Sequence, residues 1–165
     1  MSRPRRVLDR LWAPWRIAYI KRAKKEKGCL FCRVFKSRRD AQNLLVLRSK
    51  LSLALLNRYP YNTGHLMAAP VRHAKSLELL SRAELLDLML MVNRAKRLLD
   101  RVMRPQGYNI GINVGRAAGA GIVGHLHVHI VPRWIGDVNC MPSIAGTKVI
   151  SQSLEELYRE LSARA

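Results

Sequence analysis

Three of the five histidines in this chain lie within five residues, at His125, His127 and His129. Apolar residues occupy the alternate positions, Leu126, Val128 and Ile130. In an extended strand successive side chains point to opposite faces, so the three imidazoles share one face at a spacing of about 6.6 Å. An imidazole, with an ordinary pKa of about 6.5, can attack an electrophile, donate a proton or bind a metal near neutral pH. Three such rings need more hydrogen-bond partners than packing alone supplies, so we predict that this face does chemistry.

The elements that position these histidines are predicted from hydrophobic periodicity and turn signals. Five strands are expected, at about residues 44–47, 51–56, 65–69, 108–114 and 126–131. Ser81 and Glu84 have the spacing of a capping box, and apolar residues then recur at helical spacing as far as Met103. A second such pattern, Ser153 to Glu156, predicts a short C-terminal helix. The expected fold class is α+β, an antiparallel meander with one long inserted helix.

Length and composition predict one domain. The chain has 165 residues, 48% of them hydrophobic, which is enough for one core and too little for two ordinary domains. We expect a basic N-terminal arm over residues 1–28, anchored by Trp12 and Trp15, and a globular domain over residues 29–165. No segment has the length of a membrane span or the pattern of a signal peptide, so we expect a cytoplasmic protein without a membrane partner.

The charge predicts an anionic partner. The formal net charge is +19, and the first fifty residues carry sixteen Lys and Arg against three Asp and Glu. Such a field favours a phosphate-rich small molecule or the backbone of a nucleic acid. A basic surface without a specific partner is the plain alternative, and charge alone does not decide among the three.

The cysteines and the glycines supply two weaker signals. Cys29, Cys32 and Cys140 make an odd number, which argues against a disulfide framework and suits a reducing compartment. The first two have C-x-x-C spacing, which serves either a metal or a redox pair. The loop Gly115–Gly124 is rich in Gly and Ala and leads into the histidine strand, so its amides could approach a phosphate or simply form turns.

The histidine strand, His125 to Val131 followed by Pro132-Arg133, resembles the signature of the histidine triad family of nucleotidyl hydrolases and transferases. Asn57 to Pro60 followed by Gly64-His65 is similar to another family segment. Further segments resemble the branch that contains bacterial diadenosine tetraphosphate phosphorylases and hydrolases: Leu11-Trp-Ala-Pro-Trp-Arg16, Gly111-Ile-Asn113-Val-Gly115 and Pro132-Arg-Trp-Ile-Gly-Asp137. The similarity covers most of residues 11–150.

Membership of this family implies a fold, an assembly and a reaction. The fold is a HIT-like sheet of about five antiparallel strands with helices packed on it, usually in a homodimer. His127 would attack the α-phosphorus of a nucleoside polyphosphate and form a nucleotidyl-histidine, which water or inorganic phosphate then releases. The resemblance gives catalytic or nucleotide-binding positions to a larger set: His65, His125, His127, His129, Asn57, Asn113, Gly115 and Gly121.

The implied roles of this set differ. His129 would bind phosphoryl oxygens, Asn57 the ribose hydroxyls, and Asn113 the phosphate together with the backbone from Gly115 to Gly121. Many relatives have Gln-Ser or Gln-Thr just before the triad strand, where this chain has Ala120-Gly-Ile122. That side-chain donor to phosphate is therefore missing, which leaves open whether water or phosphate is the second acceptor.

Zinc-containing members of the family combine a C-x-x-C with two histidines. The corresponding residues here are Cys29, Cys32, His73 and His125. Four protein ligands leave no open position on a tetrahedral zinc ion, so the resemblance implies a structural zinc rather than a catalytic one. A pair of unliganded thiols is the alternative.

Three other functions are weighed against cleavage of diadenosine polyphosphates. The triad could hold a catalytic metal, although the outer two rings of a regular strand lie too far apart, about 13 Å, to share one ion. The chain could bind nucleic acid and remove adenylate from DNA ends, which only the charge supports. It could also hydrolyse adenosine phosphoramidates. We expect the diadenosine polyphosphate reaction because of the branch-like segments.

Overall fold

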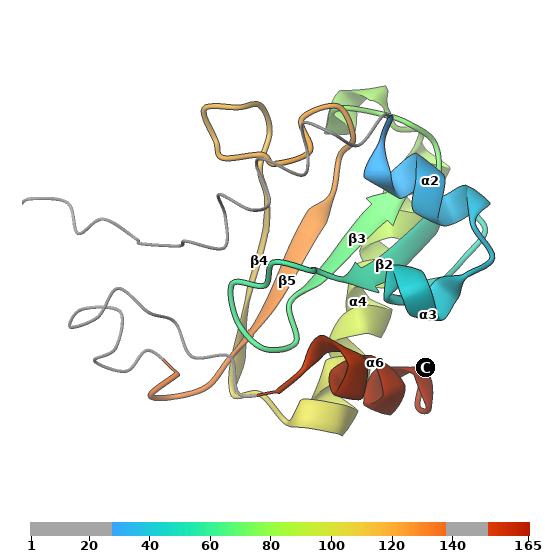
Figure 1. The fold of residues 1–165 in the computed structure, drawn as a ribbon. Helices are drawn as coiled ribbons and strands as arrows, with labels where there is room; N and C mark the ends of the chain where they lie inside the picture. The colour runs from blue at the N-terminus through green and yellow to red at the C-terminus, as the bar shows by residue number, and fades with distance from the viewer. Residues whose placement is uncertain (1–27, 138–151) are drawn as a thin grey trace, which may run out of the picture.

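A computed structural model describes residues 28–137 and 152–165, which contain a five-stranded antiparallel sheet (Figure 1). The strand order across the sheet is β1-β2-β3-β5-β4. The strands are β1 (Leu45–Arg48), β2 (Ser52–Leu56), β3 (Leu66–Pro70), β4 (Gly107–Ile112) and β5 (Val128–Arg133). Each predicted strand is present, with bounds that differ from the prediction by one or two residues at most of the ends. The predicted fold class is confirmed.

The topology differs from a simple meander in its second half. Strands β1, β2 and β3 follow one another, but β5 lies between β3 and β4, which leaves β4 at the edge of the sheet. His129 is paired with Met67 of β3 on one side and with Gly111 of β4 on the other. The histidine strand is therefore held by a neighbour on each side, and residues from both can reach its side chains.

Helix α4 (Arg82–Met103) covers one face of the sheet (Figure 1). The predicted capping box is present, because Glu84 N–H donates to Ser81 Oγ and Ser81 N–H donates to the Glu84 carboxylate. The apolar partners of the histidines belong to the core beneath this helix: Leu126, Val128 and Ile130. Helix α6 (Leu154–Ser162) begins at the predicted cap, Ser153, and completes this core. Histidines and apolar residues therefore alternate in this segment for the predicted reason, which is that the apolar side chains are buried in the core.

Two short helices were not predicted from the sequence. Helix α2 (Leu30–Lys36) packs Phe31 and Val34 on the opposite face of the sheet, against Leu53 and Met67. Helix α3 (Asp40–Asn43) follows it, and a 3-10 turn, η1 (Leu77–Leu79), precedes α4. Neither α2 nor α3 has a side-chain cap, and both are shorter than three turns, so they carry little periodic signal. Helix α2 matters for the site because it carries Cys32 and begins directly after Cys29.

Almost all of the predicted arm, with Trp12 and Trp15, lies outside the described residues, and so does Cys140. Within residues 28–137 and 152–165, no helix has both the length and the apolar composition needed to cross a membrane.

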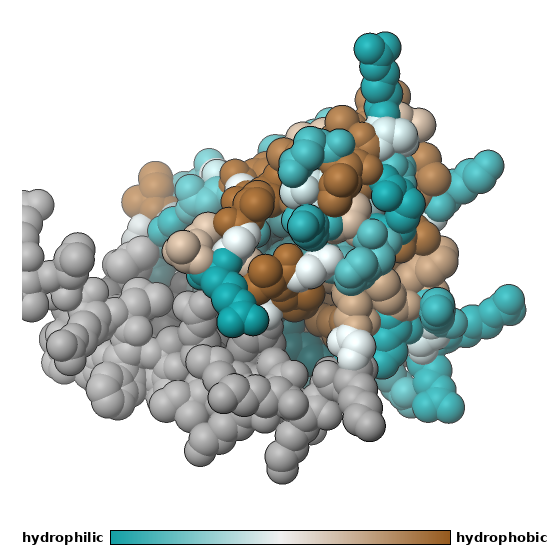
Figure 2. All heavy atoms as spheres, turned by 90° about the horizontal axis from the view of Figure 1, so that it is seen from above, coloured by the Kyte–Doolittle hydropathy of each residue, from teal (hydrophilic) through white to brown (hydrophobic). Residues whose placement is uncertain are grey.

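Seen from above, apolar and polar side chains are interspersed on the surface, and long hydrophilic side chains project at the rim (Figure 2). Exposed basic residues of the described part include Lys36, Arg38, Lys50, Arg58 and Lys75.

Candidate active site and metal cluster

The three triad histidines do not all belong to a regular strand. Strand β5 begins only at Val128, so His125 and His127 precede it. The N–H of Leu126 donates to the carbonyl of Ala74 at 2.7 Å, in the segment that follows β3. The ring of Phe31 lies 5.0 Å from the His125 ring and 5.2 Å from the His127 ring, between centroids. The rings therefore share the face opposite α4, as predicted, but each has its own set of partners.

His127 is held in one tautomer by the backbone. Its side chain is buried, and Nδ1 lies 2.9 Å from the carbonyl oxygen of His125. A carbonyl can only accept, so Nδ1 carries the proton and Nε2 of the neutral ring has an available lone pair. Burial lowers the pKa of His127, with the carbonyl hydrogen bond opposing it in part, which favours the neutral ring at pH 7. The arrangement presents an unprotonated ring nitrogen, the form that acts as a nucleophile.

His65 and His129 form a pair of rings whose tautomers are the opposite of the tautomer of His127. His65 precedes β3 and is fully buried, and its Nδ1 accepts from the N–H of Tyr61 at 3.1 Å. His65 Nε2 therefore carries the proton and donates to Nδ1 of His129 at 2.9 Å. This leaves the proton of the neutral His129 ring on Nε2. Burial, and then the nearby His127, lower the pKa of His129 to about 4.

Asn113 extends this row of donors. Asn113 directly follows β4, and its Nδ2 lies 3.5 Å from Nε2 of His129. Two N–H donors do not satisfy each other, but together they can hold one anionic oxygen.

Gly111, paired with His129, has an ordinary φ and open space where a Cβ would lie. Glycine inside a strand often marks the close approach of a ligand, and here it leaves room beside the histidine.

Asn57 lies at the end of β2 beside the same histidines. Its Oδ1 accepts from the N–H of Tyr59 at 2.9 Å, and its Nδ2 lies 3.2 Å from Nδ1 of His65. The residue is half-buried. An amide oxygen has two lone pairs, so Oδ1 retains one for a hydroxyl donor.

The glycine-rich loop between β4 and β5 is built from turns. Gly115 and Gly119 both have φ near +82°, a conformation that favours glycine. The N–H of Gly119 donates to Arg116 O at 3.0 Å, and that of Ala120 donates to Gly115 O at 3.3 Å. These two amides are therefore used within the loop, whereas Gly121 is exposed.

The second cluster consists of the predicted metal ligands, Cys29, Cys32, His73 and His125. Four potential donor atoms, one from each residue, all lie within 4.8 Å of one another. Cys29 Sγ is 3.2 Å from His125 Nδ1, and Cys32 Sγ is 3.3 Å from His73 Nδ1 and 3.7 Å from His125 Nδ1. A tetrahedral ion with bonds of about 2.0–2.3 Å separates its ligands by about 3.3–3.8 Å. The three sulfur–nitrogen separations given above match this range to within about 0.1 Å.

The tautomer of His125 also suits a metal. Its Nε2 lies 2.8 Å from the carbonyl oxygen of Pro70, so Nε2 carries the proton and the Nδ1 lone pair faces the thiols. Burial, the largest cause, lowers the pKa of His125, which favours the neutral form that a metal binds. Cys29 and Cys32 are not joined in a disulfide.

Tyr61 is a site residue that the sequence did not single out. Its ring stacks on His65, with centroids 4.8 Å apart at 25°, and lies 5.7 Å from His129. In the sequence it belongs to a turn rich in Pro, Asn and Gly, which indicates a loop but no contact. Only the folded loop brings its backbone N–H to the ring of His65.

Comparison with known proteins assigns the class to which this fold and site belong. The HIT domain profile matches residues 38–134, and the chain belongs to the HIT domain family. A Mycobacterium tuberculosis protein (strain CDC 1551 / Oshkosh) named AP-4-A phosphorylase is 42% identical over 163 residues, or 94% of this chain and 83% of the relative. A Schizosaccharomyces pombe protein named bis(5'-nucleosyl)-tetraphosphatase (asymmetrical) is 40% identical over 86 residues, or 52% of this chain and 47% of that protein. The expected family is confirmed.

Solved structures of the family share the fold. A Zn-bound histidine triad family protein from Mycobacterium smegmatis superposes with a TM-score of 0.64 at 24% identity, covering 82% of this chain and 91% of that one. A hypothetical histidine triad nucleotide-binding protein from Sulfolobus tokodaii strain 7 gives 0.65 at 25% identity, with 82% and 90% covered. The sheet with its long helix is therefore the family fold.

Proposed function

We propose that this protein cleaves diadenosine polyphosphates, such as diadenosine tetraphosphate, through a nucleotidyl-histidine intermediate on His127. The observation that carries the proposal is the hydrogen bond from His127 Nδ1 to the His125 carbonyl, which leaves Nε2 unprotonated in a buried site. The names of the similar M. tuberculosis and S. pombe proteins support the substrate class.

In the first step Nε2 of His127 attacks the α-phosphorus of the substrate. A nitrogen–phosphorus bond forms, and the bond from that phosphorus to its bridging oxygen breaks, which releases ATP from diadenosine tetraphosphate. The proton stays on Nδ1, hydrogen-bonded to the carbonyl oxygen of His125, and this hydrogen bond supports the positive charge that the ring acquires. His129 Nε2–H and Asn113 Nδ2 donate to oxygens on which negative charge grows.

In the second step an oxygen nucleophile attacks the same phosphorus and breaks the bond to Nε2. Water yields AMP, whereas inorganic phosphate yields ADP. The neutral side chains on this face do not repel an incoming phosphate dianion, and Gly121, where many relatives have Gln-Ser or Gln-Thr nearby, is exposed. We propose phosphorolysis as the favoured outcome, which the name of the M. tuberculosis relative supports.

The remaining positions are proposed as nucleotide contacts. Asn57 Oδ1 would accept from a ribose hydroxyl with its second lone pair. The loop would contribute through Gly115 and Gly121 rather than through the amides of Gly119 and Ala120, which are already hydrogen-bonded within the loop. His65 would act on the substrate through His129, since its own Nε2–H is donated to that ring.

We propose a structural zinc in the cluster of Cys29, Cys32, His73 and His125. The Cys2His2 donor set, its spacing and the tautomer of His125 suit a closed tetrahedral site. When bound, zinc would tie helix α2 to the segments that carry the two histidines. The free thiols of Cys29 and Cys32 suit a reducing compartment, so the proposal includes a cytoplasmic location.

We further propose a homodimer. In the described part of the chain, β4 lies at the sheet edge and pairs only with β5. The side chain of Ile110 on this strand is 46% exposed and that of Val114 just after it 53% exposed. An edge strand with exposed apolar residues needs a cover, and a second copy would supply one. Light scattering after size-exclusion chromatography tests this, and a single monomeric mass would contradict it.

The proposed reaction is tested by incubating the full chain with diadenosine tetraphosphate, with and without inorganic phosphate. Chromatography and mass spectrometry then identify the nucleotides. ADP plus ATP that appear only with phosphate support phosphorolysis, and AMP plus ATP without it indicate hydrolysis by the same residues. No turnover under either condition contradicts the proposed substrate and directs the test to adenosine phosphoramidates and adenylated DNA ends.

A further inference from the structure

The Tyr59–Gly64 loop, which holds Tyr61 against His65, is tied to the end of β5 by a buried polar network. We infer that Asp137 is a positioning residue for the pair His65 and His129, acting through Asn62 of this loop. The catalytic consequence of this inference rests on the proposed function, but the positioning itself does not. Four steps connect the carboxylate of Asp137 to the ring nitrogens.

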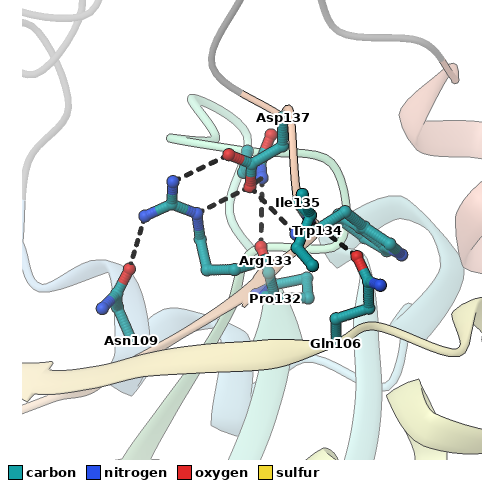
Figure 3. Close-up of polar contacts among 8 residues, drawn as sticks. Gln106, Asn109, Pro132, Arg133, Trp134, Ile135 and Asp137 are labelled. Carbon is teal, nitrogen blue, oxygen red and sulfur yellow. Dashed lines mark hydrogen bonds and ion pairs between the residues drawn. The ribbon is translucent and has the colours of Figure 1, made fainter.

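The first step is the placement of the carboxylate. Arg133, in the last position of β5, binds it with two nitrogens: Nε lies 2.6 Å from Oδ2 and Nη2 lies 2.7 Å from Oδ1 (Figure 3). The N–H of Trp134 donates to Oδ2 at 3.2 Å. The Asp137 side chain is only 9% exposed, and the guanidinium, as the largest cause, lowers its pKa to about 2. The carboxylate is thus ionised and held in one orientation.

The second step is the anchoring of Arg133 to the sheet. Its third nitrogen, Nη1, donates to Oδ1 of Asn109 on β4 at 2.7 Å (Figure 3). Nearby, the N–H of Ile135 donates to Gln106 Oε1 at 2.7 Å, which fixes the turn that leads to Asp137. The guanidinium therefore connects two strands and the turn after them, so Asp137, which lies in that turn, is tied to the sheet.

The third step joins Asp137 to the loop. Asn62 is 7% exposed, and its Nδ2 donates to Asp137 Oδ2 at 2.8 Å and to the carbonyl of Pro132 at 3.0 Å. Both amide protons of Asn62 are used on the end of β5. Gly64, with φ +79°, lets the loop pass close to Pro132, because a Cβ there would lie 3.0 Å from Pro132 Cγ and 2.6 Å from Met103 Sδ.

The fourth step reaches the catalytic pair. The carbonyl of Asn62 accepts from the N–H of His65 at 3.1 Å, and the adjacent N–H of Tyr61 donates to His65 Nδ1. That donor, together with Nδ2 of Asn57 at 3.2 Å, fixes the tautomer of His65, whose Nε2–H then donates to His129. Loss of the Asp137 contact would release Asn62, and with it one of the two donors that set the orientation of both rings.

The experiment uses the full-length protein and the isosteric variant Asp137→Asn. This change removes the negative charge that Arg133 binds. It also replaces one of the two carboxylate oxygens that face the guanidinium with an amide nitrogen, which is a donor. The control is Asp100→Asn on α4, where the carboxylate is bound by Lys96 at 2.8 Å and Tyr108 at 2.7 Å, within the opposite layer of the fold. Both variants lose a charged hydrogen-bond acceptor, but only Asp137 is connected to the histidines.

The readouts are steady-state kinetics and the ¹⁵N chemical shifts of the histidine ring nitrogens. In Asp137→Asn we expect kcat to fall about 10- to 100-fold with a small change in KM, because misplacing catalytic groups by about 1 Å has that effect. We also expect the Nδ1 and Nε2 shifts of His65 to move towards each other as the tautomer becomes mixed. Asp100→Asn should keep wild-type kcat and ring shifts.

Wild-type ring shifts and kcat in a folded Asp137→Asn protein would overturn the inference, even if its thermal midpoint falls as in Asp100→Asn. Asn62→Ala provides the second test, and the only one if Asp137→Asn does not fold. It should produce the same ring shifts, and combining the two changes should add little to the larger effect. If the wild type does not turn over diadenosine tetraphosphate, the proposed function fails, while the ring shifts still decide the positioning.

Discussion

The carbonyl oxygen of His125 lies 2.9 Å from Nδ1 of His127, while the ring of the same His125 faces the two thiols. One residue thus belongs to both clusters, because its ring lies in the proposed metal site and its backbone carbonyl contacts the proposed nucleophile, His127. Because the carbonyl sets the tautomer of His127, the position of His125 decides which nitrogen of His127 keeps a free lone pair, the nitrogen that we propose attacks the substrate. Metal binding and catalysis are therefore predicted to be linked through the position of His125, and not through a reaction in which the metal takes part.

Removal of one metal ligand is predicted to affect stability more than chemistry. In Cys32→Ser we expect less than one zinc per chain by mass spectrometry under native conditions, and a loss of about 2–4 kcal/mol in the free energy of unfolding. Turnover at low temperature should persist at a reduced rate, since His125 retains its hydrogen bond to Pro70. Cys140→Ser, which removes the third thiol, is the control. Full zinc content in Cys32→Ser would contradict the assigned ligand set.

The space beside His129 is predicted to be required for the substrate. In Gly111→Val the new side chain would lie on the histidine face in a position that is open in the structure. A β-branched residue suits a strand, so we expect an unchanged or slightly raised thermal midpoint. Turnover should fall at least about 100-fold because the side chain meets the bound nucleotide. Wild-type kcat and KM in this variant would show that no substrate group approaches Gly111.

Asn113 is predicted to donate to the phosphate. Asn113→Ala should lower kcat about 10²-fold, which is typical for loss of one donor to a charge that grows in the transition state. Asn113→Asp has the same shape but offers an anionic acceptor, so its loss should be larger than that of the alanine variant. Equal effects of the two substitutions on kcat would argue against a hydrogen bond from this side chain.

The low pKa of His129 predicts how stability depends on pH. Burial lowers its pKa from 6.5 to about 4, so as the pH falls the unfolded chain binds this proton before the folded one does. This contribution to the free energy of unfolding is therefore fully present above pH 6.5 and is lost as the pH falls towards 4. His129→Asn removes it, while the buried His127 and His125 remain. Denaturant unfolding from pH 7 to 4 should give a shallower slope for the variant at equal zinc content, and an unchanged slope would contradict the assignment.

The sequence predicted the core of the fold because that information is local. The five strands and α4 come from periodic apolar patterns and from the capping box at Ser81, which depend on neighbouring residues. The position of β5 between β3 and β4 was not predicted, since strand order depends on contacts distant in sequence. Helices α2 and α3 were missed because their stability comes from packing, as for Phe31, and not from caps or length.

The candidate site shows the same division between features that depend on local sequence and features that depend on distant contacts. His127 and His129 were identified from residue type and spacing, and the family resemblance added His65 and His73. The tautomers were not predictable, because they depend on backbone groups such as the His125 carbonyl and the N–H of Tyr61. The connection from Asp137 to His65 was also not predictable, since it crosses from the end of β5 to a loop 75 residues earlier in the chain.

The most direct test of the central claim is to trap the covalent intermediate. The protein is mixed with diadenosine tetraphosphate labelled at the α-phosphorus, without inorganic phosphate, and quenched within milliseconds in alkaline denaturant, where a phosphoramidate survives. Peptide mass spectrometry should find the labelled adenylate on the peptide containing His127, attached to Nε2 of that residue, and no label in His127→Ala. Label on another residue, or product formation by His127→Ala at the wild-type rate, would contradict the mechanism.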